Sequence, residues 1–124
     1  MMNPTILLLI SDHLVLTVVK ETLEREGMFV AAAGDIGVAV DRMAETPPDL
    51  LIAGAYTSEI SGREAATYLR SKRPGLKILI LGGFLDDDRL RNRDELAGFD
   101  VFPPRITAGQ LVAKVRGMLK GAGK

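Results

Sequence analysis

The chain has 124 residues, of which 47% are hydrophobic and 26% are charged, with 16 basic residues against 16 acidic ones and no cysteine. This length suits a single domain with one buried core, and the composition is that of an ordinary water-soluble globule. The balanced charge gives no support to nucleic-acid binding, while the lack of cysteine excludes disulfides and thiolate metal sites and agrees with a reducing compartment.

The apolar run Ile6 to Ile10 is the first predicted element, and it is far too short to span a bilayer. No basic segment precedes it as a secretory signal would require. We therefore expect a cytoplasmic protein without a membrane partner.

Apolar runs of strand length alternate along the chain with amphipathic stretches of helix length, which is the pattern of βα units in a parallel sheet. Continuous apolar runs favour strands that are buried on both faces. The predicted strands are Thr5 to Ile10, Phe29 to Ala33, Leu50 to Ala53, Lys77 to Leu81 and Asp100 to Pro103.

The segments between the strands carry helix signals. His13 to Glu26 has apolar residues at helical spacing and ends before Gly27, a common stop residue. Asp35 is placed to cap a second helix over Ile36 to Glu45, and the prolines that follow end it.

Three more helices are predicted in the second half of the chain. Ser61 and Glu64 form a capping-box pattern for a helix to about Lys72. A weakly apolar helix follows Asp86 to about Ala97, and a last helix begins after Thr107. We expect one domain over residues 1–120 and a frayed tail over residues 121–124.

Two motifs connect this pattern to a known family. Pro48-Asp49-Leu50-Leu51-Ile52 leads through a short loop to Gly62, and Gly98-Phe99-Asp100-Val101-Phe102 enters the fifth strand. Over essentially its whole length the chain resembles the receiver domain of bacterial two-component response regulators, the CheY-like family. The resemblance implies a flavodoxin-like (βα)5 fold of class α/β, a doubly wound parallel sheet of five strands in the order 2-1-3-4-5.

The resemblance also implies a phosphorylation pocket. In the family, an acidic pair after strand one and an acceptor aspartate after strand three hold Mg²⁺, while a hydroxyl after strand four and a lysine after strand five bind the phosphoryl oxygens. The counterpart positions here are Ser11, Asp12, Gly54, Gly82 and Arg105. Four of the five depart from the family pattern. We therefore predict a degenerate pocket with no aspartyl phosphorylation, no catalytic residue, and no bound metal or cofactor.

Two parts of this pocket stay open. Asp12 is either a residual ligand or pocket charge paired with Arg105, or an ordinary residue at a helix start. The segment Pro103-Pro104-Arg105 is one residue shorter than the common family form, so its conformation is not fixed by the resemblance.

Phe102 matches the family's switch aromatic, although an aromatic residue in a strand is most often part of the core. His13 is assigned no role.

The resemblance implies a non-enzymatic pseudo-receiver, a module of two-component or phosphorelay signalling that acts through protein contacts. In the family the partner face is built by the fourth helix, the fifth strand and the fifth helix; homodimerisation is left open. One alternative is a small-molecule or nucleotide sensor, because Gly54 and Gly82 leave backbone groups that a ligand can approach. Another is an enzyme or phosphoprotein modified on Tyr56, Thr57 or Ser58, although no general base or metal cluster surrounds them in the sequence.

Overall fold

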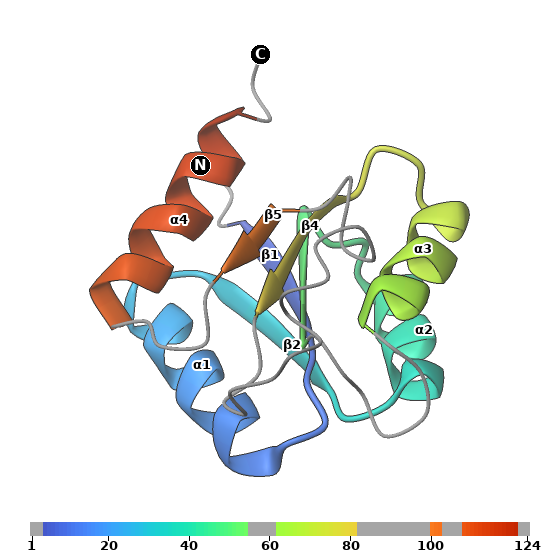
Figure 1. Cartoon of the computed structure of the whole chain (residues 1–124), viewed down its shortest axis with the longest axis horizontal. Helices are drawn as coiled ribbons and strands as arrows, with labels where there is room; N and C mark the ends of the chain where they lie inside the picture. The colour runs from blue at the N-terminus through green and yellow to red at the C-terminus, as the bar shows by residue number, and fades with distance from the viewer. Residues whose placement is uncertain (1–3, 55–61, 82–99, 103–107, 122–124) are drawn as a thin grey trace.

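The computed structural model describes residues 4–54, 62–81, 100–102 and 108–121 (Figure 1). Strands and helices alternate over residues 5–81. In chain order they are β1 (Thr5–Leu9), α1 (His13–Arg25), β2 (Phe29–Ala33), α2 (Ile36–Glu45), β3 (Leu50–Gly54), α3 (Gly62–Lys72), β4 (Lys77–Leu81), β5 (Asp100–Phe102) and α4 (Ala108–Gly121).

All strand pairs are parallel, in the order β2-β1-β3-β4-β5. The parallel α/β sheet and the order of its first four strands confirm the predicted fold. β5 contributes three residues beside β4. The helix predicted over Asp86 to Ala97 lies outside the described residues, and the single-domain prediction stays a prediction.

Some predicted boundaries were wrong by one residue. β1 ends at Leu9, although the Ile10 amide still donates a hydrogen bond to the Ala33 carbonyl at 3.1 Å. β3 continues one residue further than predicted, to Gly54, because Gly54 keeps the register with β4. α1 ends at Arg25, with Glu26 as its C-cap, and α4 extends to Gly121.

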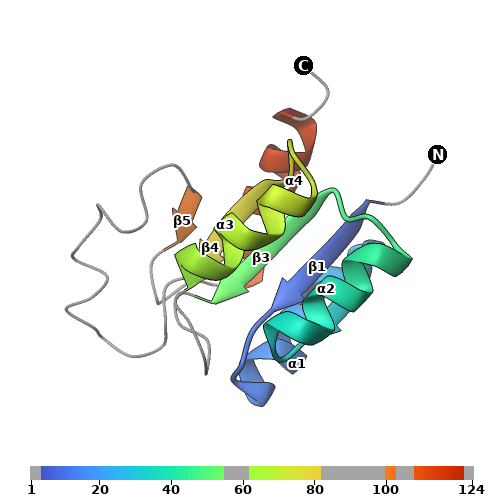
Figure 2. The same cartoon turned by 90° about the vertical axis from the view of Figure 1, so that its right-hand side faces the viewer.

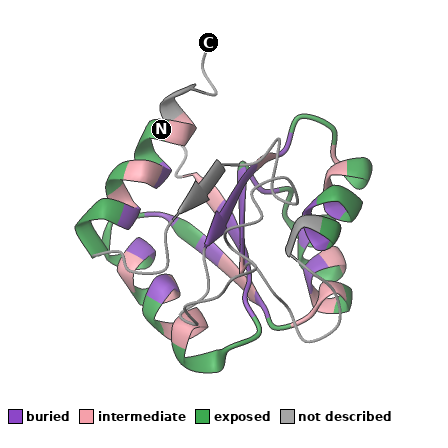
Figure 3. Cartoon of the chain, viewed as in Figure 1, coloured by how far each residue is buried: buried purple, intermediate pink, exposed green. Residues whose placement is uncertain are grey.

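Helices cover both faces of the sheet, α1 and α4 on one face and α2 and α3 on the other (Figure 2). Alternate residues of β1 point to opposite faces, so Leu7 packs in the α2–α3 layer and Leu8 in the α1–α4 layer. Burial follows this arrangement: β1, β3 and β4 are almost entirely buried, and the outer faces of the helices are exposed (Figure 3). Two apolar layers on one sheet therefore form the core.

Two helix ends that were predicted from the sequence are formed by a capping side chain and by a glycine. The Asp35 side chain accepts a hydrogen bond from the Val38 amide at 2.9 Å and caps α2 as predicted. Gly27 has a φ of 83°, a left-handed conformation that glycine adopts without a steric penalty. Its amide bonds the Glu24 carbonyl at 3.0 Å, which ends α1 and returns the chain to β2.

The amino ends of the strands are joined by polar contacts between distant residues. The Thr5 amide donates to Asp49 Oδ2 at 2.9 Å, and the Asp49 amide donates to the Thr5 carbonyl at 2.8 Å. Arg73 Nε, just after α3, donates to the Pro48 carbonyl at 2.9 Å.

In the part of the chain that the structure describes, no helix is long and apolar enough to cross a membrane.

Candidate functional site

The candidate site lies at the carboxyl edge of the sheet, where open α/β sheets usually bind their ligands. Because the strands are parallel, the ends of β1, β3, β4 and β5 meet at this edge. Leu9 pairs with Ala53, so Ser11 and Asp12 follow β1 beside the end of β3. Gly54 lies in register with Leu81, and Leu81 in register with Phe102.

Asp12 is the N-cap of α1. Its Oδ1 accepts hydrogen bonds from the Leu14 amide at 2.9 Å and the Val15 amide at 3.2 Å, and its backbone is extended, with φ −74° and ψ 114°. The residue is exposed. The geometry supports the helix-start interpretation of Asp12 and leaves Oδ2 as its second oxygen. Pairing with Arg105 lies outside the described residues and stays a prediction.

Ser11 connects the turn after β1 to the end of β2. Its hydroxyl donates to the Gly34 carbonyl at 3.4 Å, a long hydrogen bond next to the Ile10 to Ala33 backbone bond. The segment that carries Ser11 and Asp12 is therefore held between β2 and α1. A hydroxyl and one carboxylate follow β1 at this point.

Gly54 is the last residue of β3 and is half-buried. The structure thus brings three of the predicted site residues, Ser11, Asp12 and Gly54, to the same edge on adjacent strands. Mg²⁺ in proteins takes oxygen ligands at near-octahedral geometry, usually with carboxylates. Within residues 4–54 and the other described ranges, no group of three or more His, Cys, Asp or Glu side chains gathers to hold a metal.

The remaining predicted site residues are not placed by the structure. Gly82 and Arg105 lie outside the described residues, as do Tyr56 to Ser58. For Phe102 the structure describes the backbone, which pairs with Leu81, and not the side chain. Its role as a switch aromatic stays a prediction.

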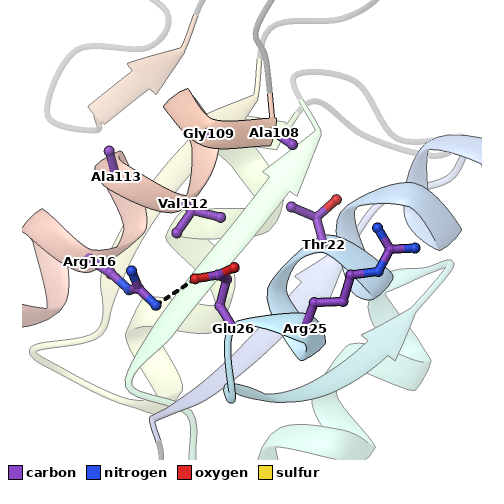
Figure 4. A pocket seen from close by; sticks show the side chains of 8 residues that line it. All are labelled: Thr22, Arg25, Glu26, Ala108, Gly109, Val112, Ala113 and Arg116. Atoms are coloured by element: carbon purple, nitrogen blue, oxygen red, sulfur yellow. Dashed lines mark hydrogen bonds and ion pairs between the residues drawn. The ribbon is translucent and has the colours of Figure 1, made fainter.

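A separate hollow of about 370 Å³ lies between α1 and α4 (Figure 4). The side chains of Thr22, Arg25 and Glu26 line it from the α1 side, and Val112 and Arg116 line it from α4. Arg116 Nη2 donates to Glu26 Oε1 at 2.6 Å across it. Among the described residues that line the hollow, none is a predicted site residue, and its ion pair joins two residues that are 90 positions apart in the chain.

Sequence reasoning missed the role of Asp49. It was assigned only to a family motif, whereas its side chain and amide both bond Thr5 and set β1 against the start of β3. An acidic residue directly before a buried strand was the available signal. The partner, 44 residues away, could not be read from local sequence.

Comparison with known proteins agrees with this geometry. Residues 6–116 match the response regulator receiver domain family. A curated relative, the probable transcriptional regulatory protein TcrX of Mycobacterium tuberculosis, is 27% identical over 123 residues. The match covers 98% of this chain and 52% of TcrX, so the chain spans about half the length of that relative.

Solved structures show the same fold. A CheY-like receiver domain protein from Methanospirillum hungatei superposes with a TM-score of 0.84 at 19% identity, covering 98% of each chain. The signal receiver domain of a putative Luxo repressor protein from Vibrio parahaemolyticus gives a TM-score of 0.81 at 18% identity, covering 98% of this chain and 94% of that one. At these identities the likeness establishes the fold alone.

Proposed function

The chain belongs to the response regulator receiver domain family, and from this premise we propose that it is a receiver module of two-component signalling that accepts no phosphoryl group after β3. In this proposal it acts through protein contacts and catalyses no reaction. The observation that carries the proposal is Gly54, the last residue of β3, at the carboxyl edge beside Ser11 and Asp12.

Covalent capture of a phosphoryl group needs a nucleophilic oxygen or nitrogen at the point of attack. A carboxylate at the end of β3 would supply that oxygen, and glycine has no side chain to do so. The carboxylate that follows β1, Asp12, uses Oδ1 to cap α1. A phosphoryl donor at this edge would therefore meet no acceptor at the position of Gly54.

Magnesium fits this edge poorly for the same reason. Mg²⁺ would bring charge that neutralises the phosphoryl oxygens, and it is usually held by one or two carboxylates together with substrate phosphates. The described side chains offer one exposed carboxylate oxygen at Asp12 and the hydroxyl of Ser11, which bonds Gly34. We expect no tight Mg²⁺ binding, and no step of the proposed function uses the metal.

Without a covalent switch, signalling has to come from binding a partner to a surface whose conformation is already set. The family's partner face corresponds here to the segment 86–97, β5 and α4, of which the structure describes β5 and α4. We assign the partner contact to this face and the protein to the cytoplasm. The matches give no support to the ligand-sensor alternative, and the loop of Tyr56 to Ser58 lies outside the described residues.

The test is phosphorylation by a small-molecule donor. Wild-type protein is incubated with acetyl phosphate and Mg²⁺, and its intact mass is measured beside that of Gly54→Asp and of the combined variant Ser11→Asp, Gly54→Asp, Gly82→Thr, Arg105→Lys. We expect no phosphoryl mass on the wild type and the largest gain on the combined variant, which has the family's acceptor, acidic pair, hydroxyl and lysine. A stoichiometric, hydroxylamine-labile adduct on the wild type would refute the proposal.

A further inference from the structure

α1 and α4 cover the same face of the sheet, and they are buried to a similar extent. Among the described side chains, α1 buries Val19 and Leu23, and α4 buries Leu111 and Val115. All four belong to one apolar layer with residues of β1, β3 and β4. Burial of apolar side chains therefore does not rank the stability of the two helices, and the local preference of each sequence for a helix decides which one opens more easily.

The sequence of α1 has several features that stabilise a helix. Asp12 caps its amino end. Lys20 Nζ lies 3.2 Å from Glu24 Oε2, one turn further along the helix. Arg25 and Glu21 form a second, longer pair of the same spacing at 3.9 Å. Since α1 also contains no glycine or proline, its sequence favours a helix independently of its packing.

α4 contains an interior glycine that the fold does not require. Gly117 lies inside the helix and is exposed, whereas the other glycines of the described helices lie at a first, second or last position. Gly27 and Gly75 have the positive φ angles that favour glycine, and Gly117 does not. A Cβ atom at Gly117 would meet no atom within 4 Å beyond the adjoining backbone. Alanine would fit there, so glycine weakens α4 without a steric reason.

The packing of α4 against α1 is incomplete. The hollow of about 370 Å³ between the two helices is lined from α4 largely by small residues, among them Ala108, Gly109 and Ala113 (Figure 4). The ion pair of Arg116 with Glu26 crosses this hollow, and its half-exposed side chains attract each other only weakly. Contacts between the two helices at the hollow therefore add little resistance to the separation of α4 from α1.

We propose that α4 is a conformational device that opens by itself, unfolding away from the sheet while α1, β1, β3 and β4 stay folded. Opening of single elements below the free energy of global unfolding is a general property of proteins, and it occurs where local stability is low. A partner that binds closed α4 stabilises the closed form, and opening lowers the affinity for that partner. This regulatory role rests on the proposed function, in which α4 is part of the partner face, whereas the opening itself does not.

The test is amide hydrogen exchange of the ¹⁵N-labelled full chain, followed by NMR without a partner. Conditions are chosen in which closing is faster than exchange, so that each rate reports an opening equilibrium. After correction for intrinsic rates, we expect the amides of Val115 and Arg116 to exchange faster than those of Leu8 and Ile52 in the central strands, by about tenfold or more.

A conservative core variant separates local from global opening. Ile78 lies in the α2–α3 layer, on the face of the sheet opposite α4. Ile78→Val should speed exchange at Leu8 and Ile52 by about two- to tenfold, because it removes one buried methylene and makes global unfolding easier. Exchange at Val115 should not change, because Ile78 stays packed when only α4 opens.

A matched pair of glycine variants tests the cause of the opening. Gly117→Ala should slow exchange at Val115 by about two- to fivefold, which corresponds to the effect of glycine in a helix interior relative to alanine. Gly34→Ala is the control, because Gly34 is exposed, lies outside the helices and also has open space around its Cβ position. It should leave exchange at Val115 unchanged.

Three results would overturn the proposal. The first is exchange in α4 through the same opening free energy as at Leu8 and Ile52, which would make the chain one cooperative unit. The second is equal acceleration of α4 and the central strands by Ile78→Val. The third is unchanged exchange at Val115 in Gly117→Ala. Phosphorylation is measured separately by intact mass, so failure of the proposed function and failure of this device are distinguishable.

Discussion

The two edges of the sheet use their polar residues differently. At the amino edge, Asp49 bonds Thr5 with both its side chain and its amide, and Arg73 bonds the Pro48 carbonyl, so residues distant in sequence are joined. At the carboxyl edge, the described carboxylate of Asp12 bonds only the helix that it starts, and Gly54 has no side chain to bond anything.

The two edges therefore have different roles: polar residues at the amino edge hold the strands together, and the carboxyl edge is the usual position of a functional site. In a parallel α/β sheet the carboxyl edge is where ligands bind, and its residues are usually committed to chemistry. Here the acidic residues described at both edges serve structure: Asp49 joins two strands, and Asp12 and Asp35 each cap a helix. This observation supports the proposed loss of phosphoryl chemistry, because Asp12 caps α1 and this structural role requires neither a metal nor a phosphoryl group.

The largest expected loss of stability comes from a substitution in the core, and the losses expected at the two edges are compared with it. Leu8 is fully buried in the α1–α4 layer. Leu8→Ala should lower the free energy of unfolding by about 2–5 kcal/mol, through lost burial and a cavity. Urea unfolding measures it, with the similarly sized Leu8→Met as control. A smaller loss of unfolding free energy for Leu8→Ala than for the variants at Asp49 and Asp12 would show that polar contacts at the edges, and not the core, dominate stability.

At the amino edge, the predicted change is Asp49→Ala. It removes the acceptor for the Thr5 amide, and because Asp49 is exposed, water replaces part of the lost bond. We expect a loss of about 1.5 kcal/mol in the free energy of unfolding. Asp49→Asn retains an acceptor oxygen and should lose less. Equal losses for both variants would show that the charge of Asp49 matters more than the bond to Thr5.

At the carboxyl edge, the predicted change is Asp12→Ala. Loss of the N-cap should lower the free energy of unfolding by about 1 kcal/mol. Asp12→Asn, which also caps well, should stay close to wild type, since asparagine and aspartate are about equal N-caps. The measurement is chemical denaturation with and without Mg²⁺. Stabilisation by Mg²⁺ that disappears in Asp12→Asn would restore Asp12 as a metal ligand.

The smallest expected effect comes from the ion pair between α1 and α4. Arg116 and Glu26 have half-exposed side chains, so water and salt weaken their attraction. A double-mutant cycle with Arg116→Ala and Glu26→Ala should give a coupling of about 0.2–1 kcal/mol that decreases at high salt. A coupling unaffected by salt would mean that the pair acts through packing and not through charge.

Much of the fold could be predicted from the sequence because its signals are local. Continuous apolar runs gave the strands, and Asp35 and Gly27 marked helix ends that the structure has at those places. Gly54 was predicted to follow the third strand directly, and the structure has it as the last residue of β3.

Other features could not be predicted because they depend on tertiary contacts. The bond from Thr5 to Asp49 and the pair Arg116–Glu26 join residues 44 and 90 positions apart. Asp12 was ambiguous for a different reason. A metal ligand after the first strand and a cap for the first helix occupy the same position, so only the direction of the side chain distinguishes them.

The most direct test of the central claim is an NMR titration of wild-type protein with Mg²⁺ and then beryllofluoride, a mimic of the phosphoryl group. If the carboxyl edge has neither a phosphoryl acceptor nor a metal site, the amide signals of Ser11, Asp12 and Gly54 should show no saturable shift. Saturable shifts at these three residues, with one bound beryllofluoride per chain, would contradict the account.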